Sequence, residues 1–409
     1  MPTSRIPVVL VILFQKTESN VFDRIRNYLV DWGKSMKVNT ANRDWHFELL
    51  RILSMLAIVI SHVAAFGTWN SKLDPVLQQG WRGAAWQTFD VFGQVGVTLF
   101  TLTSAYFLSG KKTYNVTKRI TSTWANVISI SVFCFIVLTI SQATLKAGSW
   151  DLHNLFSSIF PIINNKYWYA TAYIFLLLLS PFLNLFCKTI GINKLKDFIF
   201  IMFFIFFFLP YLNPHLSYFN DIIYLGSIYL IGCLIRMRRD LGISNVNNIK
   251  TILIIIFSFI FVFFGSLFAR SENPLSQFMG YPTNFFGAGN HAVPLASVVA
   301  GISLFWKLVN LRDERGKESN RLIDLLSKCI LRVSPYMFGV YLFHTDSNFM
   351  SLILNRIYLS EAAPGIINTV IAISVKSIVI FLISLIFSII IQQLIVNRLK
   401  YVLSKLNIV

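Results

Sequence analysis

The stretch that decides the fold runs Glu48-Leu-Leu-Arg51-Ile-Leu-Ser-Met-Leu-Ala-Ile-Val-Ile-Ser-His62. It begins the first long apolar run of the chain and carries an arginine and a histidine eleven positions apart. At about 100° per residue, eleven steps return to within about 20° of the same helix face, about 16 Å along the axis. An ionisable residue inside a membrane helix is costly and marks a functional site by default. This face therefore predicts a site that holds an anion at Arg51 and moves a proton at His62.

The composition predicts a polytopic membrane protein. Of 409 residues, 55% are hydrophobic and 13% are charged, and the mean hydropathy is +0.63. A soluble protein of this size does not hide that much apolar surface. The net charge of +18 is expected from basic cytoplasmic loops, as the positive-inside rule requires, rather than from a nucleic-acid-binding surface. The four scattered cysteines show neither a disulfide framework nor metal-ligand spacing, so no metal cofactor is expected.

Apolar runs predict an all-α fold of about ten transmembrane helices. We place them near residues 48–67, 87–108, 121–145, 167–187, 197–212, 219–235, 251–269, 290–308, 332–355 and 366–396. Alternate loops then hold roughly 28 lysines and arginines against roughly 6. By the positive-inside rule, both termini are cytoplasmic. The basic loop over 309–331 is expected to be a short helix.

The predicted organisation is one membrane domain with two short cytoplasmic ends. Residues 1–47 form an N-terminal segment, 48–396 the ten-helix domain and 397–409 a C-terminal tail. The apolar run near the N-terminus is too short to span a bilayer and has no cleavage site after it. Met36 lies just before the first span and is an alternative start of translation.

Candidate site residues fall at two depths. Arg51 lies near the cytoplasmic face, where its planar guanidinium suits phosphate. The alternative is a structural anchor, whose long side chain extends to the membrane interface and binds no ligand. His62 lies toward the outer half and can accept or donate a proton, or else makes a helix–helix hydrogen bond. Asp90 starts the second span and is placed to orient His62, unless it is simply solvated. His344, in the ninth span, is a further polar contact or a second bundle hydrogen bond.

Two further groups carry weaker signals. Lys118 and Arg119 follow the second span, where they either bind an anionic cytosolic ligand or only satisfy the orientation rule. Tyr167-Trp168-Tyr169 begins the fourth span and is either an interfacial anchor or a platform on which a sugar ring stacks. Motifs for ATP hydrolysis and for soluble serine and zinc hydrolases are absent from the sequence.

Four motifs in order make the chain resemble the acyltransferase 3 family of integral membrane acyltransferases, in particular Gram-positive polysaccharide O-acetyltransferases. The resemblance covers about residues 43–400. It rests on Arg51 followed by ten residues and His62, on Gly96-Val-Thr-Leu-Phe100 running to Ser104-Ala-Tyr-Phe-Leu108, on Tyr167-Trp168-Tyr169 with Leu179-Ser-Pro181, and on Phe338-Gly-Val-Tyr-Leu-Phe-His344. Ala105 stands where the family usually has glycine, and Lys118-Arg119 where some members have an Arg-x-Arg pair. Some members carry an appended extracytoplasmic hydrolase-like domain, which residues 1–409 do not contain, so we do not expect this chain alone to acetylate peptidoglycan directly.

The resemblance implies an enzyme of the bacterial cell membrane that transfers an acyl group, usually acetyl. The donor is cytosolic acyl-CoA, bound by Arg51, Lys118 and Arg119. The acceptor is a hydroxyl of a cell-surface or lipid-linked glycan. His62 acts as general base or transient acyl carrier, with Asp90 and His344 as further catalytic candidates. Membrane lipid is a partner and nucleic acid is not.

Two other functions remain open. A transporter or flippase for an anionic or sugar-linked substrate also uses buried Arg and His, with His as a proton relay. Such proteins often show inverted repeats, and no clear repeat is visible in this sequence. A catalytically dead assembly partner is the third possibility, against which the presence of both Arg51 and His62 argues. The sequence leaves the acceptor, the acyl chain length and the oligomeric state open.

Overall fold

The computed structural model describes residues 43–69, 84, 88–89, 92–111, 115–145, 151–209, 220–242, 248–269, 295–314, 321–350 and 366–405. Within these ranges the secondary structure is helical, with short turns and no strand, so the all-α prediction is confirmed. Residues 1–42, which include Met36, lie outside the described residues, and so does Asp90.

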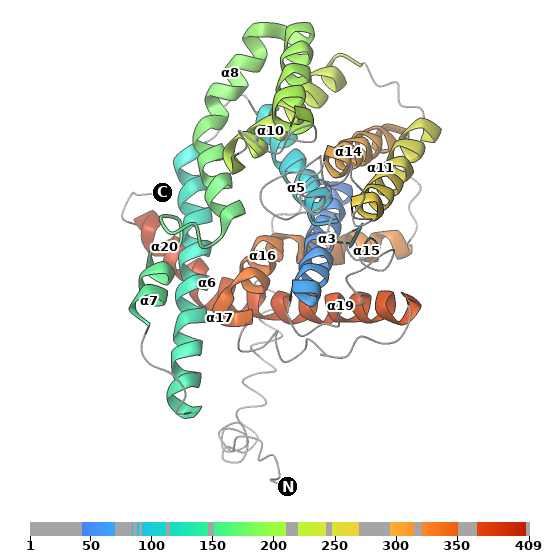
Figure 1. Ribbon diagram of the computed structural model, residues 1–409. Coiled ribbons are helices and arrows are strands. Elements are labelled where there is room, and N and C mark those ends of the chain that lie inside the picture. The colour runs from blue at the N-terminus through green and yellow to red at the C-terminus, as the bar shows by residue number, and fades with distance from the viewer. Residues whose placement is uncertain are drawn as a thin grey trace.

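The elements follow one another as a bundle of long helices with short helices between them (Figure 1). Those of the first half are α3 (Trp45–Trp69), α5 (Phe92–Ser109), α6 (Val116–Leu145), α7 (Leu152–Ile159), α8 (Trp168–Phe203) and the π-helix η2 (Phe204–Phe208). Those of the second half are α10 (Asp221–Asp240), α11 (Asn248–Ala269), α14 (Leu295–Glu314), α15 (Arg321–Val333), η5 (Ser334–Tyr336), α16 (Met337–Thr345), α17 (Ser347–Phe349), α19 (Ile366–Ile391), η7 (Gln392–Val396) and α20 (Asn397–Lys405).

Several of these helices are apolar and long enough to cross a membrane. Four candidates are found in the described ranges: Trp45–Ala64, Val116–Ser141, Trp168–Phe208 and Ile373–Lys405. Ile249–Gly265 and Leu295–Asn310 are shorter apolar helices. These helices indicate a membrane protein. The total of ten spans and the cytoplasmic placement of both termini stay predictions.

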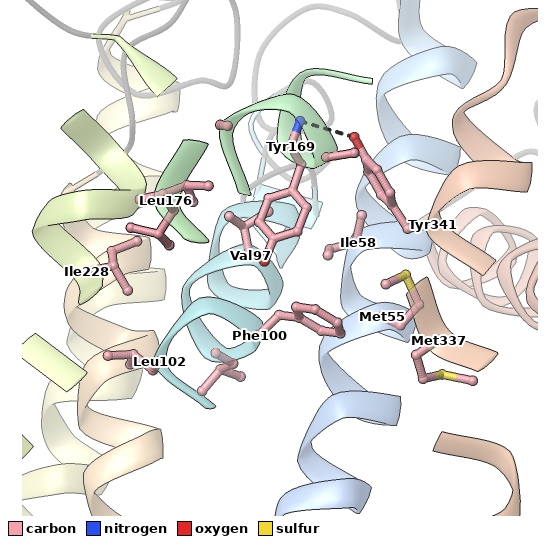
Figure 2. Close-up of a cluster of buried hydrophobic side chains, with 14 of the residues drawn as sticks. Met55, Ile58, Val97, Phe100, Leu102, Tyr169, Leu176, Ile228, Met337 and Tyr341 are labelled. Carbon is pink, nitrogen blue, oxygen red and sulfur yellow. Dashed lines mark hydrogen bonds between the residues drawn. The ribbon is translucent and has the colours of Figure 1, made fainter. Parts of the chain in front are cut away.

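Helices α3 and α5 pack closely against each other, because glycines on α5 leave room for the backbone and side chains of α3. A Cβ built on Gly93 would lie 2.4 Å from Ser61 Oγ, and one on Gly96 would lie 2.4 Å from the carbonyl oxygen of Ser54. Helix α10 packs on α5 in the same way, since a Cβ on Gly232 would lie 2.4 Å from that of Ala105. Small residues at such contacts are the usual means of packing helices in membranes. The apolar core fills the space between α3, α5, α8, α10 and α16 (Figure 2).

Helix α8 folds back on itself at Gly191. This residue has φ 74° and ψ 171°, a left-handed conformation that favours glycine, and it separates two helical limbs. The rings of Phe186 and Phe198 are 5.2 Å apart, whereas twelve residues of straight helix would separate them by about 18 Å. The 41-residue apolar stretch Trp168–Phe208 is therefore two antiparallel limbs, which agrees with the predicted break between 187 and 197.

The predicted ninth span over 332–355 differs most from the structure. Helix α16 has nine residues, about 14 Å of helix, and it stops where Asp346 turns to extended backbone at φ −72° and ψ 121°. The Asp346 side chain then accepts hydrogen bonds from the N–H groups of Asn348 and Phe349 and starts α17. A buried, side-chain-capped break replaces the long helix that the apolar run alone predicts. The expected helix in the basic stretch 309–331 is present as α15.

Candidate active site

Two histidines from distant parts of the chain meet inside the bundle. His62 on α3 and His344 on α16 are joined by a hydrogen bond of 3.0 Å between His62 Nδ1 and His344 Nε2. His344 is 2% exposed and His62 is half-buried. The sequence placed both at mid-membrane to outer depth, and the structure brings them into direct contact.

The partners of His344 define which nitrogen carries each proton. His344 Nδ1 lies 2.7 Å from the carbonyl oxygen of Val340. A carbonyl only accepts, so His344 Nδ1 carries the proton and Nε2 of the neutral ring is an acceptor. His62 Nδ1 must then donate to His344 Nε2. In the neutral state this arrangement leaves His62 Nε2 unprotonated, which is the form that a general base needs.

A second charged cluster lies at the start of α3. Glu48 is 4% exposed and pairs with Arg51, whose Nη1 is 2.9 Å from each of its carboxylate oxygens. The same carboxylate binds the fork of Arg43, at 3.1 Å from Nε and 2.8 Å from Nη2. Arg43 also donates to Ser334 Oγ at the junction of α15 and α16. Two guanidinium groups on one carboxylate leave a net charge of +1, so this cluster attracts an anion.

The Arg51 cluster and the histidine pair lie at different levels of the bundle. Phe47, next to Glu48, stacks on Tyr106 near the end of α5, with ring centroids 5.3 Å apart. Arg239 from the end of α10 donates to the Tyr106 hydroxyl, and the Arg236 guanidinium lies 5.1 Å from the same ring. Arginines of α3 and α10 therefore gather at one end, about 16 Å of helical rise from the level of His62.

A comparison with protein families identifies the family of this chain. The model of the acyltransferase 3 family, described as an acyltransferase domain, matches residues 44–395. This chain belongs to the acyltransferase 3 family. The match includes Glu48, Arg51 and both histidines, and it runs from the start of α3 into η7. No curated protein matches the chain, and no solved structure does.

In this acyltransferase, a buried ion pair holds the end of α16 beyond His344. Lys166 Nζ lies 2.9 Å from Asp346 Oδ2, and the two side chains are 9% and 0% exposed. The Tyr167 hydroxyl donates to the same oxygen at 2.5 Å, and Lys166 also donates to Ser131 and Ser158. The network ties α16 to α6, α7 and the start of α8. It therefore fixes the backbone two residues from His344.

The other predicted site residues of this acyltransferase are only partly placed. Asp90 lies outside the described residues, so its pairing with His62 stays a prediction. Lys118 is exposed and Arg119 half-buried in the first turn of α6. They follow the end of α5 closely and so lie at the Arg51 end of the bundle. Arg51 forms its ion pair with Glu48, on its own helix.

Sequence reasoning missed three site residues of this acyltransferase. Glu48 was visible three positions before Arg51, the spacing of an ion pair on a helix. Lys166 and Asp346 are 180 residues apart and gave no local signal. In the described part of the chain, no cluster of three or more His, Cys, Asp or Glu side chains is placed to hold a metal ion.

Proposed function

We propose that this membrane acyltransferase moves an acyl group, acetyl in the first instance, from cytosolic acyl-CoA to a hydroxyl of a cell-surface or lipid-linked glycan in the bacterial cell membrane. The observation that carries the proposal is the hydrogen bond between His62 and His344. The His344 ring is itself held by the carbonyl oxygen of Val340. It supports a base at His62 whose tautomer is set before substrate arrives.

The proposed chemistry needs one proton shuttle. The acceptor hydroxyl gives its proton to His62 Nε2 while its oxygen attacks the thioester carbonyl carbon. The carbon–sulfur bond breaks, an ester bond forms, and the thiolate takes the proton from His62 to leave as the thiol. While His62 carries the extra proton, its Nδ1–H still donates to His344, which stabilises the imidazolium. In a variant route, His62 Nε2 attacks the thioester carbon first, the carbon–sulfur bond breaks and CoA thiolate leaves. The acceptor hydroxyl then attacks the acyl-imidazole, the carbon–nitrogen bond breaks, and the thiolate takes the hydroxyl proton.

The donor end of the proposal rests on the Arg51 cluster. Acyl-CoA is anionic, and a guanidinium binds phosphate in a planar, two-point geometry. Glu48 holds Arg51 in one orientation while the cluster keeps a net positive charge. Lys118 and Arg119 add positive charge at the same end. The acyl-bearing arm of the donor would then reach about 16 Å along α3 to His62.

The test is the O-acetyl content of the surface polysaccharide, measured by proton NMR. Cells carry the wild-type gene, a deletion, His62→Ala or His153→Ala, with matched membrane levels of protein. His153 is exposed on α7 and is the matched histidine control. We expect acetyl signal in the wild-type and His153→Ala cells only. Wild-type acetylation in His62→Ala cells would remove His62 from the mechanism.

Transport of an anionic or sugar-linked substrate is the alternative, and family membership favours the enzyme. Purified full-length protein in lipid nanodiscs separates the two. An acyltransferase releases many equivalents of free CoA from acetyl-CoA only when an acceptor is added, whichever of the two routes it takes, and the release depends on His62. A transporter releases none.

A further inference from the structure

A polar pocket opens between the beginnings of α8 and α10, apart from the histidine pair. It has a volume of about 300 Å³ and is lined chiefly by Asn165, Trp168, Thr171, Phe175, Asn220 and Asp221. That volume is at the lower end of the range of small-ligand sites, about 300–1,000 Å³. The larger groove of the described residues, about 920 Å³ between η2, α11 and α14, is almost wholly hydrocarbon. The two cavities therefore suit different chemistry.

The lining of the polar pocket matches a ring that carries hydroxyl groups. Trp168 and Phe175 offer flat apolar faces, against which the C–H face of a sugar ring packs. Asn165, Asn220 and Thr171 carry hydrogen-bond donors, and the Asp221 carboxylate accepts, so together they suit hydroxyl groups, each of which both donates and accepts. Asn165 also has φ 48°, an uncommon backbone conformation for a residue with a side chain. An acyl chain of a lipid has no hydrogen-bonding groups to pair with these four polar side chains.

A continuous row of rings links this pocket to the histidine pair. Trp168 contacts Tyr169 with centroids 5.8 Å apart, Tyr169 contacts Tyr341 at 5.6 Å, and Tyr341 contacts His344 at 6.0 Å. The backbone N–H of Tyr169 also donates to the Tyr341 hydroxyl at 3.3 Å (Figure 2). The pocket thus lies three successive ring contacts from His344, on the same side of the core as the histidine pair.

The pocket also lies at the end of the bundle opposite the arginines. Tyr224, one turn after Asp221, donates to Gln94 at the beginning of α5 at 3.0 Å. The other end of α10 carries the Arg239 contact with Tyr106. A ligand in the pocket would therefore approach the histidines from the side away from Arg51. That arrangement lets two substrates meet at His62 without competing for one entrance.

We infer that this pocket is a subsite for the glycan acceptor, in which Trp168 stacks on one sugar ring and Asp221, Asn220 and Asn165 bind its hydroxyl groups. The inference rests on the proposed function for its biological meaning. It adds where the acceptor binds and which side chains select a sugar. Binding to the pocket needs no chemistry at His62, so the two ideas fail separately.

The experiment measures sugar binding by saturation-transfer difference NMR. The full chain is placed in phosphatidylglycerol nanodiscs without sugar-based detergent, and the probes are N-acetylchitotetraose and maltotetraose. The variants are Trp168→Ala, Asp221→Asn, His62→Ala and the matched control Trp124→Ala. Trp124 lies on α6 and is 36% exposed, away from the pocket lining.

We expect at least one tetrasaccharide to bind the wild-type chain, and at least tenfold weaker binding to both Trp168→Ala and Asp221→Asn. Trp124→Ala and His62→Ala should bind as the wild type does. No binding of either probe to the wild type, or undiminished binding to both pocket variants, would overturn the subsite. If binding follows this pattern while the deletion strain keeps its O-acetyl groups, the subsite stands and the proposed acetyl transfer fails.

Discussion

Glu48 lies with both carboxylate oxygens 2.9 Å from a single nitrogen, Nη1, of Arg51. The pair spans three positions of α3 and is largely buried on the Glu48 side, where the side chain is 6% exposed. The rest of the Arg51 fork is not used by Glu48. This geometry fixes where the guanidinium points and leaves part of it to meet an anion, so Glu48 acts as a positioning residue.

Glu48→Gln should weaken use of the acyl donor. The substitution removes the charge that holds Arg43 and Arg51 together, so the two guanidiniums repel each other and lose their common orientation. We expect KM for acetyl-CoA to rise about tenfold, equivalent to ~1.4 kcal/mol of binding, with kcat changed little. Arg51→Lys should have a similar effect through loss of the planar fork.

Steady-state kinetics of the full chain in nanodiscs measures both constants. The control is Asp324→Asn, whose carboxylate pairs with Lys328 on the exposed surface of α15, with both side chains 67% exposed. Such pairs contribute little, so its KM should equal that of the wild type. An unchanged KM in Glu48→Gln would exclude Glu48 from donor positioning.

Variants of His344 should lower kcat rather than raise KM. His344→Leu removes the acceptor for His62 Nδ1–H, so the ring loses its fixed tautomer, and we expect kcat to fall about 10²- to 10⁴-fold. His344→Gln offers a carbonyl oxygen in its place and should keep part of the activity. Because the two histidines act as one unit, the double variant with His62→Ala should be no slower than His62→Ala alone. Fully additive losses would mean that the rings act independently.

The Lys166–Asp346 pair should be needed for stability. Lys166→Met leaves the Asp346 carboxylate, 0% exposed, without its cation, and we expect a loss of about 3–5 kcal/mol. The thermal midpoint can be read with a thiol-reactive dye, since Cys134, Cys187 and Cys233 are buried and Cys329 is exposed. Lys328→Met, at an exposed pair, is the control. Lys166→Met together with Asp346→Leu should recover part of the loss. A midpoint equal to the wild type in Lys166→Met would show that the pair contributes nothing.

The contact between Ala105 and Gly232 predicts a reciprocal exchange. Gly232→Ala alone puts two methyl groups in the space of one and should cost about 1–3 kcal/mol. Adding Ala105→Gly restores the space, so the double variant should return most of the thermal midpoint. The same dye assay measures the three proteins. Failure of the second change to rescue the first would mean that the clash lies elsewhere.

The sequence predicted those features that depend on composition and on spacing within one helix. Arg51 and His62 both lie on α3, so their separation of about 16 Å along its axis followed from the helical rise. The break in α8 followed from Lys188, Lys194 and Lys196, which interrupt the apolar run. The sequence did not explain why Ala105 stands at a position where the resemblance predicts glycine. In the structure, the Ala105 methyl group fills the space beside Gly232 on α10.

What the sequence could not predict depends on contacts between distant segments. His344 was visible as a polar residue in an apolar run, but nothing local showed that its Nε2 meets His62. The early end of α16 was hidden because Asp346 is stabilised by Lys166 and Tyr167, both far away in the chain. The polar pocket likewise combines residues from two helix beginnings that lie side by side only after folding.

The reversal at Gly191 has a consequence for how the chain enters the bilayer. A straight helix over the same 41 residues would be about 62 Å long, twice the hydrocarbon thickness, and would bury three lysines near its midpoint. The bend instead sends those charges to the edge, so the two limbs can partition from the translocon as a helical hairpin. In the predicted topology, the reversal at Gly191 sets the direction in which each later segment crosses the bilayer, including α16, which carries His344.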